Sequence, residues 1–89
     1  MELTKDSAIE FPCDFPIKAM GLSTDPIENI FTNIARKHFP HMKSFNIKRQ
    51  ESSGGNYISI TIIMEALNRE QLDNVYRDLS AHKKIMMTL

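Results

Sequence analysis

The residues of this chain that are best suited to chemistry are one cysteine and three histidines, Cys13, His38, His41 and His82. Thiolate and imidazole groups ligate zinc, and together they can form a nucleophile and its base. His38 and His41 are three residues apart, but Pro40 between them ends a helix, so a shared face does not follow. There is no second cysteine, whereas a structural zinc ion needs four ligands. We therefore expect no metal and no cofactor.

Cys13 is also a poor candidate for a catalytic nucleophile. Such a cysteine needs a base within reach and a stabilised thiolate. The carboxylate of Asp14, the next residue, disfavours a thiolate by charge repulsion. We interpret Cys13 as a structural residue at the start of a strand, His38 as the end of an apolar helix stripe, and His41 and His82 as exposed. The sequence predicts a protein that is not an enzyme.

Two glycine-containing segments could approach a ligand. Gly54 and Gly55 lie between two predicted strands, so they indicate a hairpin turn and not a phosphate loop, which would lead into a helix. The segment 23–26, Ser-Thr-Asp-Pro, does predict a helix start, with Asp25 as the cap and Glu28 as its capping-box partner.

The amides at such a helix start favour a carboxylate or another anion. The candidate ligand-binding residues are Gly21, Leu22, Ser23 and Thr24. The alternative interpretation is an ordinary capped helix start, in which Asp25 occupies the amides and repels an incoming anion.

Apolar residues on a sheet face that no helix covers form a second candidate site. We predict that Met20, Ile63 and Met86 lie on this face and form an interaction surface. The alternative is that they are ordinary exposed apolar residues, which are common. The predicted face also carries Lys18, Lys48, Lys84, Asn46 and Tyr57. RNA-binding domains of this topology stack bases on aromatic residues of both central strands, and the first strand has none here, so we do not expect nucleic-acid binding.

Six elements must position these residues. Alternating apolar residues predict strands near 15–22, 45–50, 57–65 and 84–89, and helical periodicity predicts helices near 26–39 and 69–81. Asn68 is the expected cap of the second helix, with Gln71 in the capping-box position. In the last strand we expect Ile85, Met87 and Leu89 to face the helices.

The order of these elements predicts an α+β fold. Strand-helix-strand-strand-helix-strand is typical of a ferredoxin-like βαββαβ sandwich. Right-handed crossovers place both helices on one face of a four-stranded antiparallel sheet with strand order 4-1-3-2. The other face of the sheet stays open.

Length and composition limit the possibilities further. The 89 residues allow one domain, which we place at residues 11–89 after a flexible N-terminus at 1–10. Eleven basic residues balance eleven acidic ones, so no net charge attracts nucleic acid or an anionic membrane. The sequence shows no signal peptide, no membrane span and no second cysteine for a disulfide, so we expect a cytoplasmic location.

Several runs of residues resemble one family. They are the run 11–18 followed by Met20 and Gly21, the segment from Gly55 to Thr61, the run 69–72 and the run 76–82. These runs resemble the YbeD-like family of small bacterial proteins, over residues 9–89. That family is one of unknown function. The resemblance implies a ferredoxin-like fold similar to the ACT domains, which bind amino acids and regulate metabolic enzymes, and it brings no catalytic residues.

Two functions remain open at this point. The first is a non-enzymatic ACT-like regulatory module that binds a small metabolite and acts as a homodimer or on a partner enzyme. The second is a protein-interaction adaptor that uses the open sheet face without a small ligand. Neither requires a membrane or a nucleic acid.

Overall fold

The computed structural model describes residues 10–89. It contains the strands β1 (Cys13–Leu22), β2 (Asn46–Glu51), β3 (Tyr57–Ala66) and β4 (Met87–Thr88) and the helices α2 (Ile27–His38) and α3 (Arg69–Ala81). The predicted element order is confirmed. The prediction of a flexible N-terminus lies almost wholly outside the described residues.

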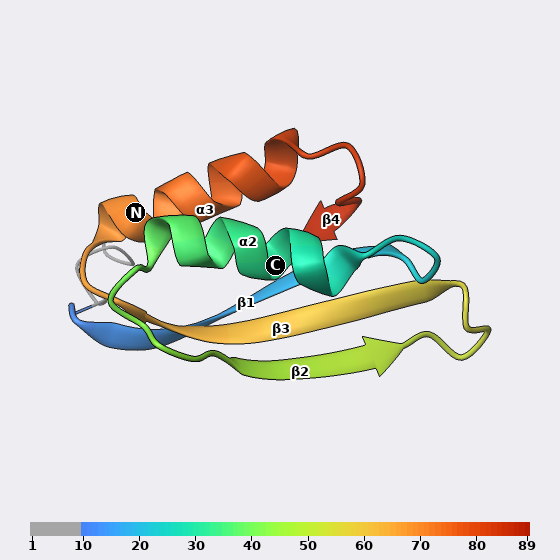
Figure 1. Cartoon of the computed structure of the whole chain (residues 1–89), viewed down its shortest axis with the longest axis horizontal. Coiled ribbons are helices and arrows are strands. Elements are labelled where there is room, and N and C mark those ends of the chain that lie inside the picture. Colours follow the sequence, from blue (N-terminus) through green and yellow to red (C-terminus); the bar gives the residue numbers. More distant parts are fainter. Residues whose placement is uncertain (1–9) are drawn as a thin grey trace, which may run out of the picture.

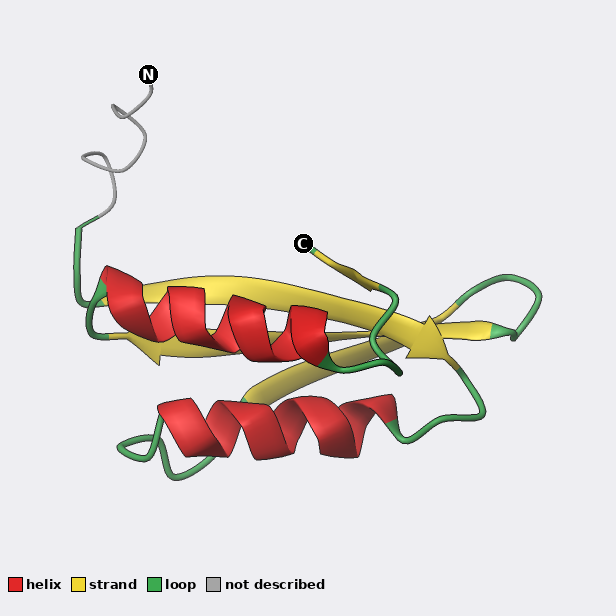
Figure 2. Ribbon diagram, turned by 90° about the horizontal axis from the view of Figure 1, so that it is seen from above, coloured by secondary structure: helices red, strands yellow, loops and turns green. Residues whose placement is uncertain are grey.

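The four strands form one antiparallel sheet with the order β2-β3-β1-β4, which is the predicted order read from the other edge. Both helices lie on the same side of this sheet (Figure 1). Seen from above, α2 and α3 lie side by side over the strands (Figure 2). The other side of the sheet carries no described element, so the predicted open face is present.

The core fills the space between the helices and one face of the sheet. Ile17 and Ala19 of β1 and Ile60 and Ile62 of β3 are fully buried there. The register places these residues opposite one another, because Ile17 pairs with Ile62 and Ala19 with Ile60. The helices complete the core with Phe31, Ala35, Leu72, Val75 and Leu79. Alternate residues of each strand point the other way, so one face of the sheet is buried and the other is exposed to solvent.

The two helix starts differ. The N–H of Gln71 donates to Asn68 Oδ1 over 3.0 Å, as predicted, and the Gln71 side chain accepts from the N–H of Leu67 over 2.7 Å. At α2, by contrast, no side chain of the described residues caps the helix, so the predicted role of Asp25 is wrong. The carboxylates of Asp25 and its predicted capping partner Glu28 bind side chains from other segments instead. Lys84 Nζ lies 3.2 Å from Asp25 Oδ1, and Arg49 Nε donates to Glu28 Oε1 over 2.7 Å.

The last strand is much shorter than predicted. β4 has two residues, and Met87 is 53% exposed instead of packing under the helices. The reason is a turn before the strand, in which the N–H of Ile85 donates to the carbonyl of His82 over 3.1 Å. Ile85 is buried, but the turn breaks the alternation that would have placed Met87 on the same face. As a result Met87, and not Met86, lies opposite Met20.

Candidate functional site

The open face of the sheet is organised in rows across the strands. Antiparallel partners share a face, so the register shows which side chains are neighbours. One row, called here the lysine row, consists of Lys48, Thr61 and Lys18 on β2, β3 and β1. The next row contains Gln50, Ser59, Met20 and Met87, and the row after it contains Tyr57 and Leu22.

No described carboxylate neutralises the lysine row. Within residues 10–89 neither Lys18 nor Lys48 has an ion pair or a side-chain hydrogen bond. Together with Arg49, Gln50, Ser59 and Thr61 they line a shallow depression of about 520 Å³. Lys18 and Lys48 lie on either side of Thr61 in the register, so this part of the face favours an anionic group.

Large apolar side chains collect beside the lysine row, and we call this region the apolar end. Leu22 and Tyr57 are each 42% exposed and lie directly opposite one another. Met20 and Met87 form the neighbouring pair, of which Met87 is the more exposed. A depression of about 190 Å³ runs between Met20, Tyr57 and the end of β2.

The predicted trio of Met20, Ile63 and Met86 is distributed over this surface. Met20 belongs to the apolar end. Ile63 lies on the same face but pairs with Pro16 and Asn46, on the far side of the lysine row and four residues along the strand from Met20's partner Ser59. Met86 precedes β4 and is 60% exposed. Met87 was predicted on the helix side because unbroken alternation was assumed over residues 84–89, and the turn from His82 to Ile85 interrupts that alternation.

The predicted ligand-binding residues lie in the turn between β1 and α2. Gly21 is buried, and a Cβ there would lie 2.3 Å from Ile27 Cδ1 and 2.7 Å from the carbonyl oxygen of Lys84. This glycine is therefore required by packing. Ser23 is anchored to the β2–β3 hairpin, since its hydroxyl donates to the Gly55 carbonyl over 2.6 Å and its N–H donates to the Asn56 carbonyl over 2.9 Å. Leu22 and Thr24 are exposed.

A shallow depression of about 360 Å³ adjoins this turn. Its lining consists of Leu22, Asp25, Lys83, Lys84 and Met86. It combines a carboxylate and two ammonium groups with two apolar side chains. A small zwitterion could bind such a set, but only by opening the ion pair of Asp25 and Lys84.

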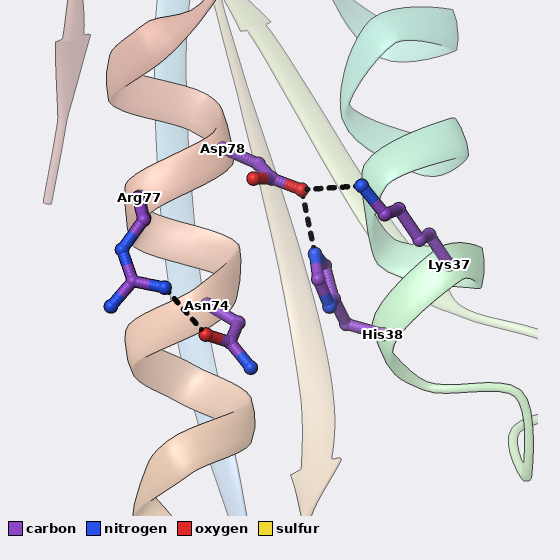
Figure 3. Close-up of polar contacts among 5 residues, drawn as sticks. All are labelled: Lys37, His38, Asn74, Arg77 and Asp78. Carbon is purple, nitrogen blue, oxygen red and sulfur yellow. Dashed lines mark hydrogen bonds and ion pairs between the residues drawn. The ribbon is translucent and has the colours of Figure 1, made fainter.

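A third polar site, which the sequence did not indicate, joins the two helices (Figure 3). His38 Nε2 donates to Asp78 Oδ2 over 2.7 Å, and Lys37 Nζ lies 3.3 Å from the same oxygen. These contacts hold the pKa of Asp78 below its ordinary value, chiefly through the hydrogen bond from His38. The side chains of His38 and Asp78 are 16% and 30% exposed, so the site is a partly buried polar contact between α2 and α3.

The cysteine and the three histidines do not come together in one site. His41 Nε2 donates to the Glu65 carbonyl over 3.1 Å, and His82 Nδ1 accepts from the N–H of Lys84 over 3.1 Å. His82 is half-buried, not exposed as predicted. Cys13 lies at the start of β1, opposite Ala66. Among residues 10–89 no three His, Cys, Asp or Glu side chains are grouped closely enough to hold a metal ion.

Comparison with known proteins decides the family. The model of the family DUF493, "Protein of unknown function", matches residues 6–89. The chain belongs to the DUF493 family. The resemblance to the YbeD-like family is thereby confirmed. Since the family is described as one of unknown function, membership by itself carries no activity.

The relatives of this DUF493 protein cover nearly all of it. It is 43% identical over 84 residues to a UPF0250 protein of Janthinobacterium, covering 94% of this chain and 92% of that protein. It is 38% identical to a UPF0250 protein of Paraburkholderia phymatum over the full length of both, and 41% identical to one of Neisseria meningitidis, covering 96% and 93%.

A solved structure supports the fold. The solution structure of protein HP0495 from H. pylori matches with a TM-score of 0.74 at 17% identity, covering 91% of this chain and 85% of that one. At this identity the match concerns the fold alone. Neither described helix of the present protein is long and apolar enough to cross a membrane.

Proposed function

We propose that this DUF493 protein is a protein-interaction adaptor that binds a partner through the open sheet face. The observation that carries the proposal is the apolar end beside the lysine row. Exposed large side chains collect there at matched positions, and no described element covers them.

The properties of this face suit a protein surface better than a small molecule. Contiguous exposed apolar side chains mark interaction sites, whereas single ones are ordinary. Methionine side chains such as Met20 and Met87 adapt to an irregular partner surface because they are unbranched and polarisable. The depressions on this face are shallow, while a small-molecule site encloses most of its ligand.

Site-specific cross-linking tests this proposal. A photo-reactive side chain at Ser59, in the middle of the open face, should capture one partner in the native cell, and the same group at Glu70 on α3 should not. The purified partner should then bind the double variant Leu22→Ser/Tyr57→Ser about tenfold more weakly or worse, as for the loss of a central apolar contact.

Both replaced side chains are exposed, so the variant should keep its fold, which a thermal melt would check. Equal capture at Ser59 and Glu70, no capture at Ser59, or unchanged affinity of the double variant would each contradict the adaptor.

A second function is supported by the depression beside the β1–α2 turn. An ACT-like regulatory module would bind a small metabolite there, with Asp25 holding an ammonium group and Lys83 or Lys84 a carboxylate. It would act as a homodimer or on a partner enzyme. Of the predicted residues Gly21 to Thr24, Leu22 lines this depression, so the metabolite would bind beside the predicted turn.

An amide-shift titration with free amino acids tests this second function. Shifts should appear at residues 21–25 and 83–86 and should disappear in Lys84→Ala. Gly21→Val is unsuitable here, because the structure leaves no room for its side chain. If saturating amino acids move none of these amides, the ligand-binding function is excluded and the adaptor remains.

A further inference from the structure

We infer that the partner of the open face is an acidic amphipathic helix. Its carboxylates contact Lys18 and Lys48, and its apolar side chains cover Met20, Met87, Leu22 and Tyr57. This inference rests on the proposed adaptor function and specifies the class of partner.

The two lysines of the lysine row require a partner that carries negative charge. Any partner that covers the apolar end also reaches this row, because the two regions occupy adjacent rows of the sheet. An ammonium group that loses water without gaining a partner carries a large cost. Lys18 and Lys48 have no carboxylate of their own within residues 10–89, so the partner must supply one.

The charges at the other end of the face set the position of the partner. Asp14 and Glu65 lie opposite one another there, beyond the row of Ile63 and Pro16. An acidic helix is repelled from that end and attracted to the lysine row. Because the protein has no net charge, this attraction is local and fixes position more than it speeds approach.

The spacing of the rows suits a helix lying along the strands. Successive rows on one face are about 6.7 Å apart, so the apolar pairs lie about 7 Å and 13 Å from the lysine row. On a helix, residues four and eight positions apart are about 6 Å and 12 Å apart. The expected pattern is therefore a carboxylate with bulky apolar residues four and eight positions away.

A helix also satisfies its own backbone hydrogen bonds. The face of a sheet offers side chains and no free backbone groups, so an extended segment would leave its own N–H and C=O groups unpaired when covered. α2 and α3 solve the same problem on the other face of this sheet (Figure 1).

Single-stranded RNA is the other polyanion that such lysines could bind. RNA-binding sheets stack bases on aromatic residues of the two central strands. On this face the central positions of β1 and β3 are Lys18, Met20, Ser59 and Thr61, and Tyr57 is the aromatic residue at one end. Aliphatic and thioether side chains favour an apolar helix surface over bases.

A pair of designed peptides tests the inference. One helical peptide carries Glu at the contact position with Leu four and eight residues away, and the matched peptide carries Lys in place of Glu. In amide-shift titrations the acidic peptide should move the amides of Lys18, Met20, Lys48 and Ser59. Its Kd should weaken about tenfold or more in Lys18→Glu/Lys48→Glu.

The control variant is Arg36→Glu/Arg77→Glu, which changes the net charge equally at two exposed positions on α2 and α3, on the other side of the sheet. Its Kd for the acidic peptide should change less than about twofold. The Lys peptide should bind the wild type about tenfold more weakly than the Glu peptide does, and should bind Lys18→Glu/Lys48→Glu better than the wild type.

Four results would overturn the acidic helix: no binding of the Glu peptide, equal binding of both peptides, equal binding to both charge-reversed variants, or tighter Lys18-dependent binding of a single-stranded RNA. A natural partner captured at Ser59 that binds Lys18→Glu/Lys48→Glu with full affinity would also overturn it, while leaving the adaptor in place. The absence of any partner specific to Ser59 would instead remove the adaptor itself.

Discussion

Gly21 lies where three segments of the chain meet. It is in β1, the Ile27 side chain at the start of α2 packs on it, and the carbonyl of Lys84 from the segment before β4 lies beside it. The absence of a side chain lets these segments approach one another. Its role is close packing, because its φ is not positive whereas that of Gly55 is.

Gly21→Ala should therefore destabilise the protein. The Ile27 side chain can move, but the Lys84 carbonyl belongs to the backbone and must shift, so we expect a loss of about 1–3 kcal/mol, as for an overpacked core. Urea unfolding measures this change. Gly54→Ala is the control, since its nearest neighbour would be Asn56 Nδ2 at 3.6 Å. Equal stability of the two variants would show that the Lys84 carbonyl does not pack against Gly21.

Asp78 should give stability a dependence on pH. Its pKa is lowered in the folded state, first by the hydrogen bond from His38. A lowered folded pKa stabilises the protein above the unfolded pKa of about 4, and the contribution is lost as the pH falls through the folded value. Near pH 5 we expect the free energy of unfolding of the wild type to be about 0.5–1 kcal/mol larger than that of Asp78→Asn. This difference should disappear as the pH falls below ~4.

Urea unfolding at a series of pH values measures this difference. Asp73→Asn is the control, because Asp73 contacts Arg69 from a half-exposed position on the same helix. This variant keeps the contact of His38 with Asp78, so its stability should still fall below pH ~4 through that contact. A difference between wild type and Asp78→Asn that stays constant down to pH ~3 would contradict the assigned role of the His38 contact.

The helices begin in different ways because their neighbours differ. Asn68 faces the first turn of α3 and accepts from Gln71 without competition. Asp25 precedes α2, but its carboxylate lies within reach of the Lys84 ammonium group. A charged partner binds a carboxylate more strongly than a backbone amide does. α2 therefore depends on packing and on the link from Glu28 to Arg49 of β2.

Removal of the α3 cap should cost a defined amount. Asn68→Ala leaves the Gln71 amide without its acceptor, and we expect a loss of about 1 kcal/mol in the free energy of unfolding, measured in urea. Asn68→Asp should retain most of the stability, because a carboxylate caps equally well and its charge suits a helix N-terminus. A full loss in Asn68→Asp would mean that Asn68 acts through another contact.

The sheet edges are poorly suited to pairing with another strand. The C-terminal segment bonds to the backbone of β1 from Met20 to Lys18, and on the edge of β1 before Lys18 lie the charged Asp14 and Pro16, which has no N–H to donate. The other edge, β2, carries Lys48 and Arg49. These features leave the open face as the better surface for a partner.

The molecule as a whole is a sheet with one face buried under two helices and one face exposed to solvent. Ile60 is fully buried under the helices, while Ile63, three residues later on β3, lies on the open face. An aspartate at each position therefore meets a different environment. The contrast tests the assignment of the two faces directly.

Ile60→Asp should unfold the domain, since an unpaired buried charge costs several kcal/mol against a total stability of about 5–15 kcal/mol. Ile63→Asp should remain folded and lose about 1 kcal/mol, the range of strand propensity. Far-ultraviolet circular dichroism with thermal melts would measure both. A cooperative melt of Ile60→Asp near that of the wild type would show that Ile60 is not in the core.

Properties that depend on neighbouring residues could be predicted from the sequence alone. The alternation in β1 and β3 indicates which residues face the core, and the segment from Asn68 to Gln71 contains both partners of its cap, so the sheet, both helices and the open face were correct. Helix and strand periods are local, and a hydrophobic core of this size admits few arrangements of six such elements.

Contacts between distant residues were decided by the tertiary structure. The carboxylate of Asp25 binds Lys84, 59 residues away in the chain, and the hydrogen bond between His38 and Asp78 joins residues 40 apart. Met87 rather than Met86 came to lie opposite Met20, because the turn after α3 interrupts the alternation. The sequence predicted that an exposed apolar surface exists, but the contribution of Met87 to it follows from the pairing of β4 with β1. Charged and exposed side chains choose among several partners of similar energy, and only the folded chain determines which partner is within reach.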